Sequence, residues 1–235
     1  MKFGALLARA WNLYRTHFVL IAMITVIVWL PGDLLEGYLE KYVFGVDNFQ
    51  FSFQFSNFYT CCIGIIATGG ILALLEHAAI GEKLTLAQAM IQGLENWGRL
   101  WFAGLVLGVL SIAGLVLLIL PGMILMVRCS LLSALVVRNR VTGMKAVRLS
   151  FAYTKGYFWR LLWWFAVVIL AGISFSMIIS FLSNLAFNWW IINVATTVLG
   201  DMALAFWTVF MWVVYDEILT HGDAEELTPK SWLPI

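Results

Sequence analysis

Apolar stretches long enough to cross a lipid bilayer recur along this whole 235-residue chain, and they restrict its fold more than any other feature. A transmembrane α-helix needs about 20 consecutive, mainly apolar residues. Hydrophobic residues make up 63% of the sequence and charged residues 11%, against about a quarter charged in soluble domains. Because a soluble fold needs more polar residues to cover its surface, the sequence predicts an all-α, polytopic membrane protein.

The apolar stretches predict a bundle of six transmembrane helices. Pro31-Gly32 should kink the first helix, and Pro121-Gly122 should end the third. Residues 49–58 alternate phenylalanine with polar residues, which favours an aromatic belt at the membrane interface over a short hairpin. The expected ranges are 18–35 with an extension to 42, 58–80, 100–120, 123–137, 158–185 and 189–219. A single transmembrane domain would thus occupy residues 1–219, followed by a short cytoplasmic tail over 220–235.

Three further segments have an apolar stripe at helical spacing and are too polar to span a membrane, so we expect amphipathic helices on the cytoplasmic surface. They cover residues 2–17, 82–97 and 142–157. Each precedes a predicted hairpin, and a Leu-Pro-Gly triplet recurs at 30–32 and 120–122. The pattern indicates a possible threefold repeat of surface helix plus hairpin.

The distribution of basic residues predicts the orientation. With the N-terminus inside, only Lys41 of the 14 lysines and arginines falls in an outer loop, and Arg128 lies within a predicted helix. Positively charged residues favour cytoplasmic loops, so both termini are expected in the cytoplasm. The first residues lack the pattern of a cleaved signal peptide, which predicts insertion by uncleaved helices.

Several classes of function are disfavoured by composition and motifs. A net charge of +1 argues against binding to nucleic acid. Cys61, Cys62 and Cys129 lie in apolar segments without zinc-ligand spacing, so we expect inert thiols and no metal. No nucleophile elbow, His-Glu-x-x-His, phosphate-binding loop or dinucleotide fingerprint is present, so we expect neither enzymatic activity nor a cofactor.

Arg128 and Asp201 are the main candidates for a site inside the membrane, where an unpaired charge costs several kcal/mol. At 1.5 Å per residue they lie about 10 Å and about 16 Å from the outer ends of their helices. An arginine side chain can bridge that difference, so we predict that they pair or share water. A structural ion pair that fixes helix register and a substrate or proton site both remain open.

Two further groups lie near the cytoplasmic surface. Glu76 and His77, close to the end of the second helix, are expected to form interfacial hydrogen bonds, with a ligand-binding role as the alternative. A basic rim is expected to contact anionic lipid headgroups at about 1 kcal/mol per residue, as a general anchor or as a specific phosphate pocket. The rim consists of Arg138, Arg140, Lys145, Arg148, Lys155 and Arg160. Asp216 and Glu217 should face it.

The second half of the chain also carries a recognisable set of motifs. They are Leu-Pro-Gly at 120–122, Gly-Met-Lys-Ala-Val-Arg-Leu-Ser at 143–150, Thr-Lys-Gly-Tyr-Phe-Trp-Arg at 154–160 and Val-Tyr-Asp at 214–216. In these motifs the sequence resembles the YciC-like family of bacterial inner-membrane proteins, which is similar to the membrane domain of some glycerophosphodiester phosphodiesterases. The resemblance implies six helices in the bacterial inner membrane, and it leaves the activity open.

Two functions are therefore expected. The first is a non-enzymatic accessory, anchoring or scaffolding subunit that contacts membrane lipids and possible protein partners. Sparse buried polarity and short loops favour it. The alternative is a small transporter or lipid-handling protein that uses an intramembrane Arg128/Asp201 site.

Overall fold

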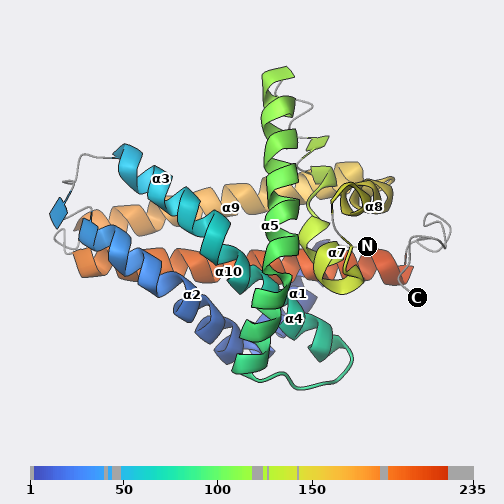
Figure 1. Ribbon diagram of the computed structural model, residues 1–235, viewed down its shortest axis with the longest axis horizontal. Coiled ribbons are helices and arrows are strands. Elements are labelled where there is room, and N and C mark those ends of the chain that lie inside the picture. The colour runs from blue at the N-terminus through green and yellow to red at the C-terminus, as the bar shows by residue number, and fades with distance from the viewer. Residues whose placement is uncertain are drawn as a thin grey trace.

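The computed structural model describes residues 3–39, 42–43, 49–117, 124–125, 127–141, 143–185 and 190–221. All the regular secondary structure in this part of the chain is helical, as the sequence predicts (Figure 1). The helices are α1 (Phe3–Thr16), α2 (Phe18–Leu39), α3 (Phe49–Tyr59), the short π-helix η2 (Thr60–Gly64), α4 (Ile65–Ala79), α5 (Leu86–Leu117), α7 (Leu132–Asn139), α8 (Met144–Thr154), α9 (Phe158–Leu185) and α10 (Trp190–His221).

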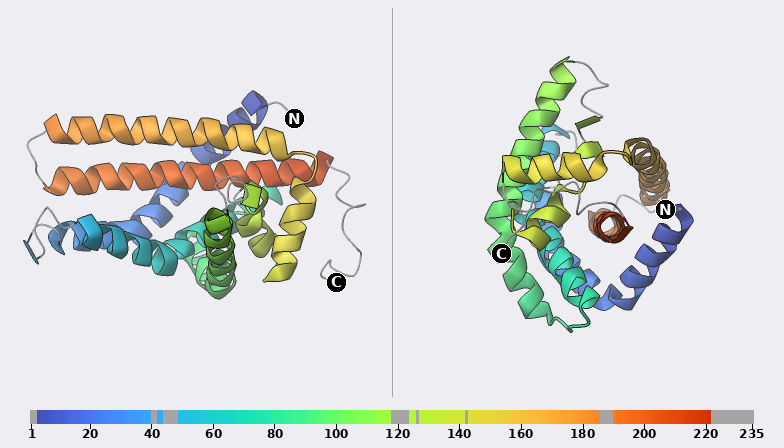
Figure 2. Two further views of the ribbon diagram at one scale, coloured as in Figure 1. Left: turned by 90° about the horizontal axis from the view of Figure 1, so that it is seen from above. Right: turned by 90° about the vertical axis from the view of Figure 1, so that its right-hand side faces the viewer.

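The hydrophobic core surrounds the second half of α10. Phe210, Trp212 and Tyr215 are each at most 1% exposed, and they pack with residues from α1, α2, α4, α7 and α8. Figure 2 shows α10 end-on, with α1, α9 and the α4–α5 pair arranged around it. The helix that the sequence places last therefore organises the whole bundle.

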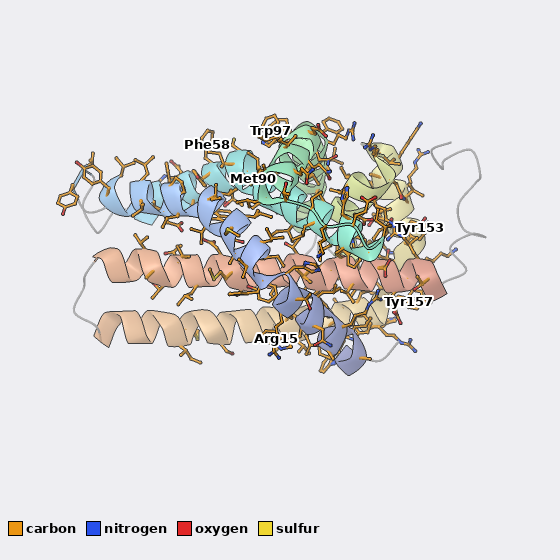
Figure 3. The ribbon with its side chains drawn as sticks, turned by 90° about the horizontal axis from the view of Figure 1, so that it is seen from below. Arg15, Phe58, Met90, Trp97, Tyr153 and Tyr157 are labelled. Atoms are coloured by element: carbon orange, nitrogen blue, oxygen red, sulfur yellow. The ribbon has the colours of Figure 1, made fainter. Side chains whose placement is uncertain are left out.

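Three helical segments of the described chain are long and apolar enough to cross a membrane: Phe18–Leu39, Gln54–Ala79 and Val194–Thr220. They correspond to the predicted first, second and sixth spans. Their outer surfaces carry exposed apolar side chains, among them Val19, Phe58 and Leu204. The chain is thus a helical protein with apolar helices of membrane-spanning length. Figure 3 shows Phe58 and Trp97 at the edge of the molecule away from α9.

The predicted boundary between the surface segment 82–97 and the third span is wrong. A single helix of 32 residues, α5, runs through it. The junction contains no proline, and the lone Gly98 costs only about 1 kcal/mol in a helix interior, which is too little to end one. Figures 1 and 2 show α5 crossing α9 and α10 at a steep angle, so the described part of the predicted third span, residues 100–117, does not run alongside them.

The predicted fourth span, residues 123–137, is not one helix either. Residues 129–131 form a turn, and only the eight-residue α7 follows it. The backbone N–H groups of Ser130 and Leu132 bond to carbonyls three residues back, and the Ser130 hydroxyl donates to the Val127 carbonyl at 2.8 Å. Such side-chain bonds compete with the helical ladder, which explains the break.

Residues 49–59 form helix α3, so the alternative of a short hairpin is wrong. The first span continues through Pro31 to Leu39. The Tyr59 hydroxyl of α3 donates to the Val28 carbonyl at 2.6 Å, close to the turn that Pro31 disturbs. A Cβ at Gly32 would lie 2.5 Å from the Tyr59 ring, so Gly32 leaves the space that Tyr59 occupies.

Helices α4 and α5 pack closely because glycines meet at their crossing. A Cβ at Gly93 of α5 would lie 2.6 Å from the Ile66 carbonyl oxygen and 3.0 Å from the Gly70 nitrogen. A Cβ at Gly69 would lie 3.1 Å from the Gly93 Cα. Gly69 and Gly70 of the second predicted span therefore permit close contact with α5.

The proposed repeat has a partial counterpart. A turn separates α1 from α2 at His17, and another separates α8 from α9 at residues 155–157. The corresponding middle segment has no such turn, because it forms one helix, α5, with the residues that follow it. The ends of α8, α9 and α10 agree with the sequence-based ranges to within three residues. The threefold repeat itself stays a prediction.

Candidate functional site

The main polar site lies where α4, α7 and α10 meet. Arg138, in the last turn of α7, donates from Nη1 to Asp216 Oδ1 of α10 at 3.0 Å, and its Nε lies 3.6 Å from Glu76 Oε2 of α4. The Trp212 indole N–H of α10 donates to Glu76 Oε1 at 2.7 Å. One guanidinium therefore stands between two carboxylates from different helices.

Helix α1 joins the same cluster through Arg9. Its Nη2 lies 2.6 Å from Asp216 Oδ2, and its Nη1 lies 3.4 Å from Glu217 Oε2. The Asp216 carboxylate is thus shared between Arg9 and Arg138, and four helices are tied together. We call this set of six side chains the Arg138 network: Arg9, Glu76, Arg138, Trp212, Asp216 and Glu217.

The electrostatic environment keeps Arg138 charged. Burial lowers the pKa of its guanidinium, but the hydrogen bond to Asp216 and the charge of Glu76 outweigh burial, so the net shift is upward. Its carbon Cζ also lies 5.8 Å from the centroid of the Tyr215 ring, within the range of a cation–π contact. A permanent cation at this position neutralises carboxylates that would otherwise repel each other.

A cavity of about 310 Å³ opens beside the network, between α4, α5 and α7. Its polar lining comes from Glu76, His77, Gln92, Glu95, Asn96, Arg99, Arg138 and Arg140. The charged lining comprises three guanidiniums, of Arg99, Arg138 and Arg140, and two carboxylates, of Glu76 and Glu95. Arg99 contacts the Asn96 side-chain oxygen at 3.4 Å, and within the described chain neither Arg99 nor Arg140 forms an ion pair.

The fold positions Arg140 through an unusual backbone. Arg140 ends α7 in the left-handed region, at φ 50°, a conformation that costs a non-glycine residue energy. It is the sole non-glycine residue with positive φ among the described residues. This turn brings the Arg140 side chain into the same cavity as Arg99 from α5.

His77 contributes a hydrogen-bonding edge to this cavity. Its Nδ1 donates to the Ala73 carbonyl at 2.9 Å, which leaves Nε2 near Gln92 Nε2 at 3.5 Å and Glu82 Oε2 at 3.8 Å. Over the described residues, no group of three or more His, Cys, Asp and Glu side chains is placed to hold a metal ion.

A second cavity of about 670 Å³ lies on the other side of the network, between α1, α4 and α10. Arg9, Asn12, Thr16 and Asp216 supply its polar lining, and much of the rest is alanine and leucine. Arg138 lines both cavities, so the Arg138 network forms the partition between them.

The predicted pair of Arg128 and Asp201 is not formed. The Arg128 guanidinium lies over the rings of Phe151 and Phe158, with Cζ 5.4 Å and 5.8 Å from their centroids. Asp201 instead hydrogen-bonds to Asp33 of α2. The pairing prediction compared depths along two helices, but a depth does not define which faces of the helices meet.

The basic rim divides into two parts. All six residues are exposed, but only Arg138 and Arg140 line the cavity described above, whereas the other four lie on and after α8. These four are Lys145, Arg148, Lys155 and Arg160. Tyr153, beside them on α8, turns inward and makes an edge-to-face contact with Tyr215 at 6.2 Å (Figure 3).

Sequence reasoning identified Glu76, His77 and Arg138 as polar candidates and placed Asp216 against the basic rim, but it did not join them. It missed the contribution of Arg9, which lies on the first amphipathic helix, and it did not name Asp33 as a candidate. The length of the apolar run could have indicated that Asp33 lies within a membrane-spanning helix. The 22-residue helix α2 does include Asp33, despite Pro31.

Comparison of the chain with family models, with curated proteins and with solved structures finds no match. The YciC-like resemblance therefore stays a prediction from the motifs alone.

Proposed function

We propose that this chain is a non-enzymatic, multi-pass membrane protein that serves as an accessory or anchoring subunit and binds the phosphate headgroups of anionic phospholipids at its cytoplasmic face. The observation that carries the proposal is the cavity between α4, α5 and α7, where Arg99 and Arg140 lack a carboxylate partner within the described chain. Guanidinium groups bind phosphate oxygens through paired hydrogen bonds.

The surroundings of the cavity support a lipid ligand. The exposed residues Lys145, Arg148, Lys155 and Arg160 extend the positive surface beyond α7. The stacked indoles of Trp97 and Trp101, 6.2 Å apart and each 37% exposed, lie on the same helix as Arg99. Tryptophan is enriched at the level of lipid headgroups, and basic clusters beside it attract anionic lipids.

The proposal includes the location that the sequence suggests, the bacterial inner membrane with both termini in the cytoplasm. It retains six spans, supported beyond the three segments above by the 28 residues of α9. The third span has less support, because α5 crosses α9 and α10 at a steep angle. The fourth span has the least support because of the turn at residues 129–131.

The alternative, a small transporter that uses Arg128 and Asp201 together, has less support, because the two residues have different partners. Neither residue is among the side chains that line the two cavities at the network. A lipid-handling role through those cavities remains compatible with the same headgroup contacts.

Purification in a native-lipid nanodisc, followed by mass spectrometry of what stays bound, tests this proposal. Retention of an anionic phospholipid near one per chain supports headgroup binding, and a stoichiometric protein partner supports the accessory role. Retention of lipids in the bulk ratio of the membrane, with no partner, would contradict both.

A further inference from the structure

A second polar site lies between α2 and α10, away from the headgroup cavity. Asp33 and Asp201 hydrogen-bond to each other across these helices, and their residues are 8% and 7% exposed. Both belong to segments of membrane-spanning length and apolar character, Phe18–Leu39 and Val194–Thr220. Ionisable groups in such a position are costly to keep and are functional candidates.

Each carboxyl group has one oxygen that the protein leaves unsatisfied. The Oδ2 atoms of Asp33 and Asp201 are buried and have no hydrogen-bond partner. Buried polar atoms nearly always have a partner, so an unsatisfied oxygen on each carboxyl group requires an explanation. These oxygens are an observation independent of the hydrogen bond between the carboxyl groups. They favour a protonated group over two carboxylates, because a buried carboxylate oxygen without a donor is costly.

The groups that face this pair offer no positive charge among the described residues. Glu36 on α2 adds a further carboxylate that acts on Asp201. Tyr59 of α3 is close enough to sense the charge of Asp33, but its hydroxyl donates to the Val28 carbonyl. Tyr14 of α1 donates to the carbonyl of Met202, the neighbour of Asp201, at 3.2 Å.

Two ionised carboxylates cannot hydrogen-bond to each other, because neither has a proton to donate. In a low-dielectric interior without a counter-ion, like charges this close also cannot both ionise. We propose that Asp33 and Asp201 bind one proton between them and form a proton-binding site inside the bundle. One carboxyl group donates, the other accepts as carboxylate, and the pair carries one negative charge rather than two.

The proton-binding site is independent of the proposed headgroup function, because it shares no residue with the cavity at Arg99 and Arg140. It gives the bundle a group whose charge changes with proton uptake at the contact between α2 and α10.

Dicyclohexylcarbodiimide provides a direct probe, because this apolar reagent adds across a protonated carboxyl group and rearranges to a stable N-acylurea, with all atoms of both retained. The purified full-length protein is treated at neutral pH, and labelled residues are located by peptide mass spectrometry. We expect labelling at Asp33 or Asp201 and none at the exposed Glu82. A wild-type protein without label at either aspartate contradicts the proposal.

The matched variants are Asp33→Asn and Asp201→Asn. An asparagine amide can donate to the remaining carboxylate, which then needs no proton, so its labelling should fall about tenfold. Unchanged labelling would show that the two carboxyl groups titrate separately and would overturn the shared proton. Protection by sodium chloride, but not by choline chloride, would show that the pair holds a metal cation instead.

Two further measurements guard against misfolded variants and hidden partners. Infrared spectroscopy of the wild type should show a protonated carboxyl stretch at neutral pH, and its absence would contradict the proposal without any mutation.

Lys41 lies outside the described residues, and Lys41→Gln should leave the labelling unchanged. A rise in labelling would identify Lys41 as a counter-ion and replace the shared proton by an ion pair.

Discussion

Arg138 and Asp216, 78 positions apart in the sequence, form the ion pair that connects α7 to α10, with 3.0 Å between Nη1 and Oδ1. Asp216 in turn binds Arg9 of α1, and Arg138 approaches Glu76 of α4. Helix α7 buries Leu132, Ala134, Leu135 and Val136 in the core. The ion pair adds a polar contact at the end of α7, beside the point where Arg140 lines the cavity.

Replacement of Arg138 by glutamine should destabilise the folded protein by about 1–3 kcal/mol, between the values for exposed and for buried ion pairs. The substitution leaves Glu76 and Asp216 near each other without the cation between them. Thermal unfolding in detergent measures the effect. The double variant Arg138→Gln/Glu76→Gln should recover part of the loss, and strictly additive effects would contradict the network.

Replacement of Arg9 by glutamine should cost less, about 0.5–1 kcal/mol, because the Arg9 side chain is 43% exposed and solvent screens its ion pairs. Arg15→Gln is the matched control, since Arg15 is exposed on the same helix and forms no ion pair within the described residues. Equal effects of the two substitutions on the unfolding temperature would show that Arg9 does not hold α1 against α10.

Substitution of Gly93 by alanine should destabilise the α4–α5 contact by about 1–3 kcal/mol, because the added Cβ would lie 2.6 Å from the Ile66 carbonyl oxygen. Gly98→Ala on the same helix meets no atom within 4 Å, and it should be neutral or slightly stabilising. Unfolding in a denaturing detergent compares the two variants, and a similar loss in both would argue against close packing at Gly93.

The variants Arg128→Gln and Asp201→Asn should have additive effects on stability, to within about 0.5 kcal/mol, because the residues have different partners. Arg128 contacts the rings of Phe151 and Phe158, and Asp201 contacts Asp33. A double-mutant cycle of unfolding free energies measures the coupling. A coupling well above that value would restore the pair that the sequence suggested.

The membrane orientation is tested by labelling single cysteines in a variant from which Cys61, Cys62 and Cys129 have been removed. A membrane-impermeant maleimide added to intact cells should label Asp47→Cys and should leave Lys145→Cys unlabelled. The reverse pattern would overturn the orientation that the basic residues predict.

The sequence predicted the elements whose signal is local. Hydropathy located α2, α9 and α10, and amphipathic spacing located α1 and α8, because both features depend on neighbouring residues. The break at residues 129–131 depends on a side-chain hydrogen bond of Ser130. The continuity of α5 depends on the small free-energy cost of Gly98 in a helix. The length of an apolar segment reports neither. The central position of α10 depends on its packing with α1, α2, α4, α7 and α8, which hydropathy does not report.

The candidate site was predictable as a list of residues and not as an arrangement. Glu76, His77 and Arg138 stood out because polar groups near apolar helices are rare. Their contacts with Arg9 and Asp216 depend on how four helices pack, which no single segment encodes. Arg128 and Asp201 show the opposite outcome, since similar depths in the membrane brought them together in the prediction but not in the fold.

Headgroup binding in the cavity of Arg99 and Arg140 is the central claim, and the most direct test measures lipid retention by native mass spectrometry. The wild type, an Arg99→Gln/Arg140→Gln variant and the control Arg15→Gln are each transferred into detergent with equal amounts of phosphatidylglycerol and phosphatidylcholine. We expect the wild type and the control to retain phosphatidylglycerol preferentially, and the double variant to lose that preference about tenfold. Equal retention of both lipids by the wild type, or an unchanged preference in the double variant, would contradict the account.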